Sequence, residues 1–532
     1  MTAPPGNRTV LILADRIHTL TRPGSQPDAD AILVRNGVIA AIGPRTGLDV
    51  EATVDDTIDL RGATLTPGLV DSHIHLTEWA LARRDTDLGA TESPEAAARA
   101  VYEAAPPAHG DWIRGRGWNP HRWRAAEPRR ALIDSLIPDR PVLLQSHDMH
   151  ALWVNGEALR RARIDAATPD PQGGRIVRDD NGEPTGLLLE NAAQLITRSL
   201  PPVTPRAAAD AVAGGQAVLH AWGITGVHTL PAIHIAEPEP LSVLEAMRSQ
   251  ATLRLRVLQH IPLHQLDDAI RTGLYSGFGG DWIRVGGVKI FLDGALGSRT
   301  ALMVDPYEGT DARGIQVLDP GEFRYHVRRA ARAGISSTVH AIGDAAVGLA
   351  IDVLGDPANR VEETPHRIEH VQCIPRGRAG DIGRAGITAS VQPGHLITDW
   401  RIADRHWGPD RAGRTYALRT LLDGGALLAF GSDAPVEPAD PRLGLFAAVA
   451  RTDLDGQPAG AWYADERLSI EQAFMGYTTG PARASASRFA GLVPGAYADI
   501  AAWASDPLTA RPEELLTLDC IATIVGGEIA RS

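Results

Sequence analysis

The sequence predicts an α/β protein built on a (β/α)8 TIM-like barrel, with a composite β-sandwich domain from both termini and a large insertion after barrel strand 1. Three observations support this fold class. Apolar, strand-like runs alternate with helical segments through the middle of the 532-residue chain, which is typical of a parallel sheet. Both ends are rich in short strands and turns. The stretch between the first two barrel strands is too long for an ordinary strand–helix connection.

The two ends are predicted to form one β-sandwich domain from residues 1–62 and 483–532. Asn36-Gly37 lies between two apolar runs and is a strong signal for a tight hairpin. A similar texture of short apolar runs returns at residues 491–503 and 520–529. Because these β-rich ends flank a different middle, we expect them to pair with each other.

The barrel is assigned to residues 63–81 and 201–482. Between its strands we expect helices at residues 205–222, 322–333 and 414–424. The eight expected strands are residues 64–72, 224–229, 253–260, 283–291, 334–340, 365–370, 387–392 and 427–433.

The insertion is assigned to residues 82–200. It contains a strand-like run at residues 141–145 and a second hairpin signal at Asn181-Gly182. An insertion after the first strand is placed to cover the barrel mouth, so we expect a lid-like subdomain there.

Composition limits the partners. A net charge of −13 and a pI near 5.8 argue against nucleic acid and anionic membranes, and favour a small-molecule substrate. The start lacks an apolar signal core, and no run reaches the roughly 18 apolar residues of a membrane span, so we expect a cytoplasmic protein. Cys373 and Cys520 form no spaced framework and are expected to be buried. A homodimer is left open.

Lys289 is the single lysine among 52 lysine and arginine residues. It lies in a mostly apolar, strand-like run. An arginine keeps its proton, whereas a lysine amine in a desolvated site can lose it. The neutral amine can take up carbon dioxide and become a carbamate, which is an anionic ligand for metal ions. The alternative is a surface lysine that survived by chance.

Several metal-ligand types follow the expected barrel strands. His73 and His75 end the first strand, and alternate residues of an extended chain point the same way, so both can reach one ion. Barrel enzymes place their chemistry at the carboxyl ends of the strands, where residues distant in sequence meet. Such a set suits one or two divalent ions, zinc first, with manganese or iron as alternatives. The candidate ligands are His73, His75, Lys289, His340, His370 and Asp433.

Eight short motifs are spread over nearly the whole chain. They are Thr66-Pro-Gly-Leu-Val-Asp-Ser-His-Ile-His75, Gly115-Arg-Gly-Trp-Asn119, Ser146-His-Asp-Met-His-Ala-Leu-Trp-Val-Asn155, Gly287-Val-Lys-Ile-Phe-Leu-Asp-Gly294, His340-Ala-Ile-Gly-Asp344, Arg367-Ile-Glu-His370, Ser390-Val-Gln-Pro-Gly-His395 and Gly431-Ser-Asp-Ala-Pro435. With them the chain resembles the amidohydrolase superfamily, and within it the YtcJ-like (amidohydrolase-3) branch that includes N-substituted formamide deformylases. The resemblance implies the same barrel, composite β-sandwich and insertion.

The expected chemistry is hydrolysis of a non-peptide carbon–nitrogen bond by metal-activated water, with an amide such as an N-formyl or N-acyl amine as substrate. Asp433 would take the proton from water and give it to the departing nitrogen, because a nitrogen anion is a poor leaving group. Two alternatives stay open: an ester, lactone or cyclic imide hydrolase, and a non-catalytic metal-binding regulatory protein.

Further residues are candidate substrate contacts because they lie in the insertion or close to the ends of barrel strands. One of them, an arginine, would meet a substrate carboxylate. They are Trp118, His147, His150, Asn155, His228, Arg299 and His395.

Overall fold

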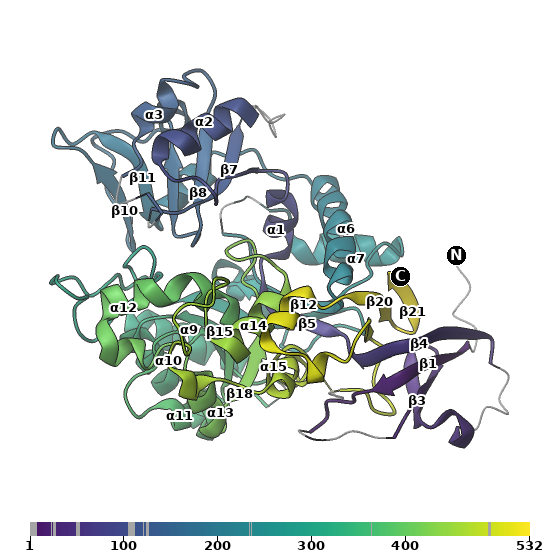
Figure 1. Ribbon diagram of the computed structural model, residues 1–532. Coiled ribbons are helices and arrows are strands. Elements are labelled where there is room, and N and C mark those ends of the chain that lie inside the picture. Colours follow the sequence, from purple (N-terminus) through teal and green to yellow (C-terminus); the bar gives the residue numbers. More distant parts are fainter. Residues whose placement is uncertain are drawn as a thin grey trace.

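The structure is a computed structural model, and it describes residues 8–22, 24, 28–48, 54–104, 112–120, 122–123, 127–233, 235, 237–362, 364–487 and 491–531. Its strands form an eight-stranded, a seven-stranded and a six-stranded sheet. Figure 1 shows the six-stranded sheet on one side of the barrel and the sheet from the two termini at its other end.

The eight-stranded sheet is the predicted parallel barrel, and the fold class is confirmed. The strands follow one another around the barrel in chain order, and each neighbouring pair is parallel. A bridge between Ile74 and Ala434 joins its two edges, together with a 2.6 Å hydrogen bond from the Asp433 amide to the His73 carbonyl. The strands are β5 (Leu69–Ile74), β12 (Ile224–Thr229), β13 (Arg256–Pro262), β14 (Ile283–Phe291), β15 (Ser337–Ala341), β16 (Arg367–His370), β17 (Thr388–Val391) and β18 (Leu427–Phe430).

The first barrel strand differs from the prediction. Residues 64–67 belong to β4 (Asp56–Pro67), which pairs with strands of the terminal sheet, and β5 begins only after Gly68. A Cβ at Gly68 would lie 2.3 Å from the Thr225 side chain, so the chain passes β12 too closely for any other residue there. One continuous apolar run therefore serves two sheets.

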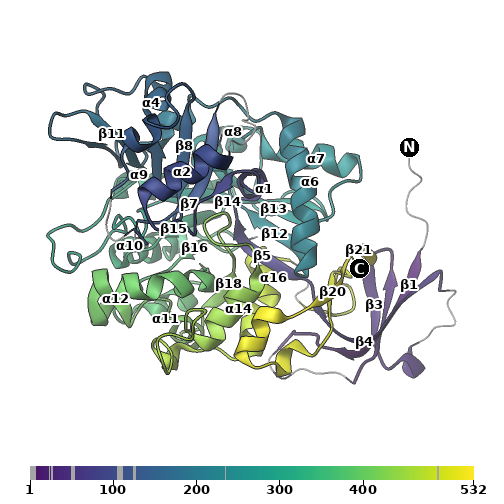
Figure 2. The same ribbon diagram turned by 45° about the horizontal axis from the view of Figure 1, so that its top comes forward.

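Helices surround the barrel and cover its outer face (Figures 1 and 2). In β14, Val288 and Ile290 are fully buried and belong to the same apolar cluster as Phe323 on α9. The helix expected at residues 414–424 begins only at Leu418, because Tyr416 has a left-handed φ of 49°. The helices are α1 (Leu76–Ala82), α6 (Pro205–Ala221), α7 (Pro240–Ser249), α8 (Leu266–Arg271), α9 (Pro320–Arg332), α10 (Asp344–Leu354), α11 (Ala379–Arg384), α12 (Leu396–Ala412), α13 (Leu418–Asp423), α14 (Pro441–Ala450), α15 (Ile470–Tyr477) and α16 (Thr479–Ala484).

Strands from both termini join in one seven-stranded sheet, in the order β21-β20-β19-β4-β1-β2-β3. Asn36 and Gly37, with φ of 52° and 80°, form the predicted two-residue turn. Besides β4, the strands are β1 (Thr9–Ile17), β2 (Ala31–Arg35), β3 (Val38–Gly43), β19 (Ile500–Trp503), β20 (Cys520–Val525) and β21 (Glu528–Arg531).

The insertion carries the six-stranded sheet and its own core, in which Trp118, Trp123 and Trp153 pack together. The predicted hairpin at Asn181-Gly182 joins two of its strands. The domain boundaries at residues 62, 82, 200 and 483 stay predictions. The strands are β6 (Thr86–Asp87), β7 (Ile113–Trp118), β8 (Val142–Ser146), β9 (Ala151–Val154), β10 (Gly174–Arg178) and β11 (Pro184–Glu190), and the helices are α2 (Pro94–Ala104), α3 (Arg130–Asp134), α4 (Gly156–Ala162) and α5 (Ala193–Thr197).

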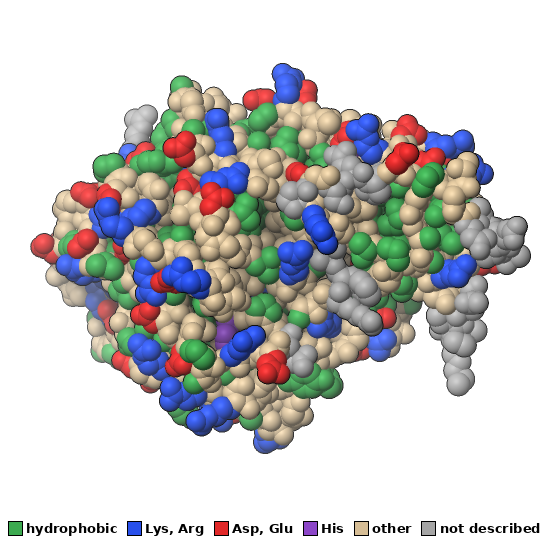
Figure 3. Space-filling model, turned by 90° about the horizontal axis from the view of Figure 1, so that it is seen from below, with side chains coloured by type: hydrophobic (Ala, Val, Ile, Leu, Met, Phe, Trp, Pro, Cys, Tyr) green, Lys and Arg blue, Asp and Glu red, His purple; other side chains and the backbone are tan. Residues whose placement is uncertain are grey.

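The charged side chains on one face of the molecule and the two cysteines can be compared with what the composition predicts. On the face seen from below, acidic and basic side chains are interspersed (Figure 3). Both cysteines are free and buried, as predicted. Within the described ranges, no helix combines the length and the apolar character that crossing a membrane requires.

Candidate metal centre

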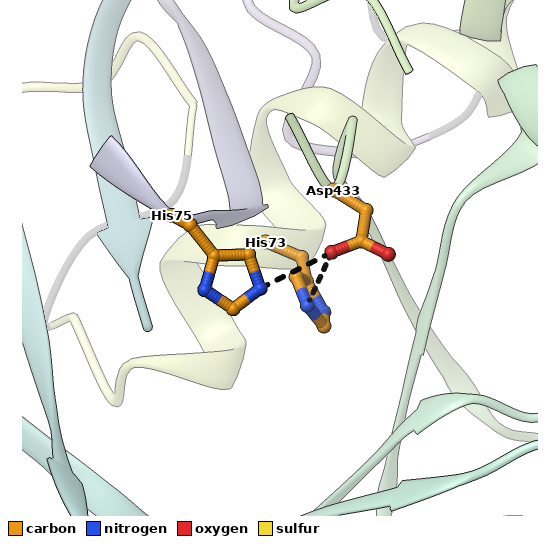
Figure 4. A group of neighbouring side chains, drawn as sticks. All are labelled: His73, His75 and Asp433. Atoms are coloured by element: carbon orange, nitrogen blue, oxygen red, sulfur yellow. Dashed lines mark ion pairs between the residues drawn. The ribbon is translucent and has the colours of Figure 1, made fainter. Parts of the chain in front are cut away.

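His73, His75 and Asp433 converge at the seam where the barrel closes (Figure 4). His73 is in β5, His75 directly follows it, and Asp433 comes three residues after β18. The Nε2 atoms of His73 and His75 lie 3.0 Å and 3.4 Å from Asp433 Oδ1. All three side chains are buried. The sequence-predicted histidine pair and the aspartate therefore share one small space.

The other ring nitrogen of each histidine is held by an acceptor. His73 Nδ1 lies 2.5 Å from Glu369 Oε2, and His75 Nδ1 lies 2.7 Å from the Pro231 carbonyl oxygen. Both Nδ1 atoms therefore act as donors, which leaves the Nε2 lone pairs facing Asp433 Oδ1. A cation placed between these three atoms would satisfy all of them at once. Two imidazole nitrogens and one carboxylate oxygen are a donor set that suits a divalent ion.

Two buried carboxylates hold this arrangement in place. Glu369 also accepts a 2.6 Å hydrogen bond from Arg367 Nε, and Arg367 and His73 keep the pKa of Glu369 well below its usual range although burial opposes this. Asp71 accepts from the backbone amides of His73 and Ser432, both at 3.0 Å, and from Ser432 Oγ at 2.5 Å. Asp71 thus joins β5 to the loop after β18. Carboxylates behind metal-binding histidines fix ring orientation in this way.

His340 and His370 lie beside the group formed by His73, His75 and Asp433. The ring of His370 is 4.5 Å from that of His340 and 5.0 Å from that of His73. His340 Nε2 donates to the Gly294 carbonyl at 3.1 Å, so its Nδ1 is the unprotonated nitrogen. His370 and Asp433 have φ of 73° and 61°, a conformation that costs energy in residues other than glycine and concentrates at functional sites.

Lys289, in β14, is close enough to Asp433 and Glu369 to interact with their charges. It is 3% exposed, so the alternative of a surface lysine is wrong. Its Nζ has no hydrogen-bond partner among the described residues and sits 4.6 Å from the Phe291 ring centroid. Burial lowers the pKa of Lys289 to about 8, although Glu369 and Asp433 act in the opposite direction.

The insertion brings two of its predicted histidines to the barrel mouth. His150 Nδ1 is 2.7 Å from Glu190 Oε2, and its ring is 5.6 Å from the His340 ring. Burial opposes protonation of His150, but Glu190 outweighs it and raises the pKa to about 9. His147 Nε2 forms a 3.0 Å ion pair with Glu437, beyond the end of β18.

The structure corrects two other residues of the insertion. Trp118 is 2% exposed, stacks on Trp123 and donates its indole N–H to the Leu144 carbonyl at 2.9 Å. Asn155 caps α4 by accepting from the Ala158 amide, and it also donates to two backbone carbonyls. Both side chains are used inside the insertion and do not reach the mouth.

The three remaining candidates have different surroundings. His395 Nε2 is 3.9 Å from Asp433 Oδ2, so it lies beside the candidate ligands. His228 is a correction: Nη1 of Arg367 donates to its Nδ1 at 3.0 Å, and burial followed by Arg367 lowers the pKa of His228 well below its usual value. Arg299 is also a correction, because it is exposed in a turn and does not line the cavity beside Lys289.

A family model for the Amidohydrolase family matches residues 56–531. The chain belongs to the amidohydrolase family. YtcJ of Bacillus subtilis (strain 168), named as an amidohydrolase, is 33% identical over 531 residues, covering 96% of this chain and 97% of its own. An N-substituted formamide deformylase of Arthrobacter pascens is 28% identical, with 98% of each chain covered. The crystal structure of a metal-dependent hydrolase from Pyrococcus horikoshii OT3 superposes with a TM-score of 0.78 at 26% identity, covering 95% of this chain and 99% of that one.

This amidohydrolase is therefore an enzyme. Sequence reasoning gave no role to three carboxylates that organise the centre: Asp71, Glu190 and Glu369. Asp71 and Glu369 were within reach, because each lies one or two residues before a predicted ligand and inside a family motif. Glu190 had no such signal, since its position depends on how the insertion folds onto the barrel.

Proposed function

We propose that this amidohydrolase cleaves a non-peptide carbon–nitrogen bond, in an amide such as an N-formyl or N-acyl amine. The observation that carries the proposal is the group of two Nε2 atoms and one carboxylate oxygen facing one another in a buried space. His73, His75 and Asp433 would hold a divalent ion there, zinc first, with His340, His370 and Lys289 as further ligands of one or two ions. A divalent ion in such a site supplies an activated water and polarises a carbonyl group.

Asp433 suits the proton transfer that amide cleavage needs. Its Oδ1 faces the two histidines, while Oδ2 lies on the side of His395. Oδ2 would receive the proton from the attacking water and pass it to the departing nitrogen. The His73 and His75 pair would keep Oδ1 fixed during this transfer.

His150 would orient the substrate from above. Its Nδ1 is held by Glu190, and Thr300 Oγ1 donates to the same carboxylate at 2.5 Å. The ring lines the cavity beside Lys289, so its remaining nitrogen is available as a hydrogen-bond donor to a substrate carbonyl. Carboxylation of Lys289 would add an anionic ligand in the lining of that cavity.

The test combines metal analysis with a substrate panel. Protein stripped by chelation and reloaded with zinc, manganese or iron is expected to hold at least about one ion per chain and to release amines from N-formyl and N-acyl amides faster than alcohols from matched esters. His73→Ala should lose both metal and activity.

A matched control comes from His18, an equally buried histidine that pairs with Asp506 outside the barrel mouth. His18→Ala is expected to keep the metal. A His73→Ala protein with wild-type metal content and turnover would refute the proposed metal site. Faster cleavage of the matched esters would refute the proposal that the enzyme acts on carbon–nitrogen bonds.

A further inference from the structure

A cavity of about 840 Å³ opens beside Lys289, one of the candidate ligands. It is lined by Lys289, Phe291 and Asp293 in and just after β14, by the insertion from Met149 to Gln194, by the loops after β12 and β13, and by α9. This volume is typical of a site for one small molecule. The chemistry of its lining should therefore select the substrate.

The cavity lining offers little to a negatively charged substrate. It contains one lysine and one arginine, Lys289 and Arg329. Arg329 is paired with Asp267, and Lys289 is already a candidate metal ligand. The His150 imidazole is engaged by Glu190. In the described lining, a substrate carboxylate would therefore meet only cationic side chains that have a carboxylate partner or are assigned to the metal, and burying it there would cost free energy.

Carboxylates, in contrast, are in excess, with five in the lining. Glu237, in the loop after β12, accepts a 2.8 Å hydrogen bond from the Ala232 amide but forms no ion pair with any described residue. Burial, with Glu78 and Glu239 adding to it, raises the pKa of Glu237 to about 7. Burial and neighbouring acids destabilise the ionised form of such a carboxylate, so a positively charged ligand nitrogen beside it would stabilise that form strongly.

Apolar side chains occupy the lining around these groups. They leave room for the apolar part of a substrate without offering it hydrogen bonds. They are Met149, Ile233, Ile235, Leu263, Phe291 and Leu318.

We infer that the substrate is an amide of a basic amine: besides the scissile bond it carries a positively charged nitrogen, joined to it by an apolar spacer, and no carboxylate. Glu237 binds the charged nitrogen. This inference rests on the proposed amide hydrolysis for the chemistry, but the charge preference belongs to the cavity itself.

The experiment uses the metal-loaded full chain and three N-formylbenzylamines that differ only in the para group: aminomethyl, methyl or carboxylate. We expect kcat/KM for the cationic amide to exceed that for the anionic one by at least about tenfold. If none of the three is hydrolysed, calorimetry of the intact amides with the same protein measures the preference as affinity. Failure of the proposed reaction therefore leaves this test in place.

Glu237→Gln is expected to lower the ratio of cationic to neutral amide, in kcat/KM or in affinity, by about tenfold. Glu245→Gln is the control, because Glu245 pairs with Arg248 on the solvent-exposed face of α7, and it should keep the wild-type ratio. The inference is overturned if the anionic amide equals the cationic one, if none of the amides binds, or if Glu237→Gln leaves the ratio unchanged.

Discussion

Lys289 is the single lysine of the chain, and its buried surroundings differ from those of a surface cation. All 51 other cationic side chains among the 52 lysine and arginine residues are arginines. Lys289 is buried, lacks a hydrogen-bond partner among the described residues and has its pKa lowered to about 8 by burial. Near neutral pH a fraction of this amine is therefore unprotonated, as carbamate formation requires.

We expect Lys289→Arg to lower kcat/KM by more than about 100-fold and to reduce metal content. This loss is larger than the loss typical for substitutions of residues that only hold a metal ligand in place. Arginine stays protonated and would place a permanent cation against the metal. Metal analysis and steady-state kinetics measure both effects, with an unfolding curve to verify folding.

Two variants separate charge from chemistry at this position. Lys289→Met keeps the apolar stem without the charge and should also lose activity. Lys289→Ala should regain some activity when short carboxylic acids and metal are added, since these can occupy the vacated position. A Lys289→Arg enzyme with wild-type metal and kcat/KM would show that the lysine is an accident of composition.

At the residue scale, prediction from sequence succeeded where a strand end fixes the side chain. His73, His75 and Asp433 lie at or just after the carboxyl ends of strands that must meet in any parallel barrel, so their convergence needs no knowledge of loops. Trp118 and Asn155 lie in the insertion, where sequence gives no such constraint. Polar or aromatic character alone did not separate a pocket residue from a cap or a core residue.

Trp118 also shows how the insertion stabilises itself. Its ring centroid lies 5.3 Å from that of Trp123 and 6.4 Å from that of Trp153. The indole N–H donates to the Leu144 carbonyl of neighbouring β8. The three rings therefore connect β7, the following loop and β9 in one core.

We expect Trp118→Phe to lower the free energy of unfolding of the insertion by about 1–2 kcal/mol, because it removes one buried hydrogen bond and part of the ring stack. Below the unfolding transition, kcat/KM should stay within about twofold of wild type, as for a residue remote from the substrate. Denaturant unfolding followed by tryptophan fluorescence, with kinetics in parallel, measures both. A large fall in kcat/KM at unchanged stability would show that Trp118 contacts the substrate after all.

At the element scale, the alternation of strands and helices located all eight barrel strands, but it could not divide a continuous apolar run. The break between β4 and β5 depends on the approach of Gly68 to Thr225, which is a tertiary contact. The late start of α13 likewise follows from the backbone of Tyr416. Periodicity reports which residues are buried, and not which sheet buries them.

The insertion and the barrel are held together at the mouth by contacts between residues far apart in sequence. His147, after β8, pairs with Glu437, after β18, at 3.0 Å. Glu190, at the end of β11, accepts from Thr300 in the loop after β14. The candidate substrate cavity lies between the two bodies, so these contacts also determine its shape.

The ion pair between His147 and Glu437 should make the attachment of the insertion to the barrel depend on pH. Glu437 outweighs burial and raises the pKa of His147 from 6.5 to about 9, while His147 outweighs burial and lowers the pKa of Glu437 below 4.5. A raised histidine pKa contributes stability that is fully present below the ordinary value of 6.5 and is lost as the pH rises through about 9. The lowered carboxyl pKa contributes above 4.5 and is lost in stronger acid.

We therefore expect His147→Gln to lower the free energy of unfolding by about 1–2 kcal/mol at pH 6. The effect is limited to this size because the ion pair is partly exposed and therefore screened by solvent. Near pH 10 the variant and the wild type should converge, since the wild-type imidazole is then neutral. Urea unfolding at pH 6, 8 and 10 measures the difference, and Glu437→Gln should reproduce it at pH 6. In the double variant the two effects should fail to add at pH 6, because each substitution removes the same interaction. A difference between His147→Gln and wild type that is equal at all three pH values would mean that the contact acts by packing alone, and that protonation of His147 does not hold the insertion on the barrel.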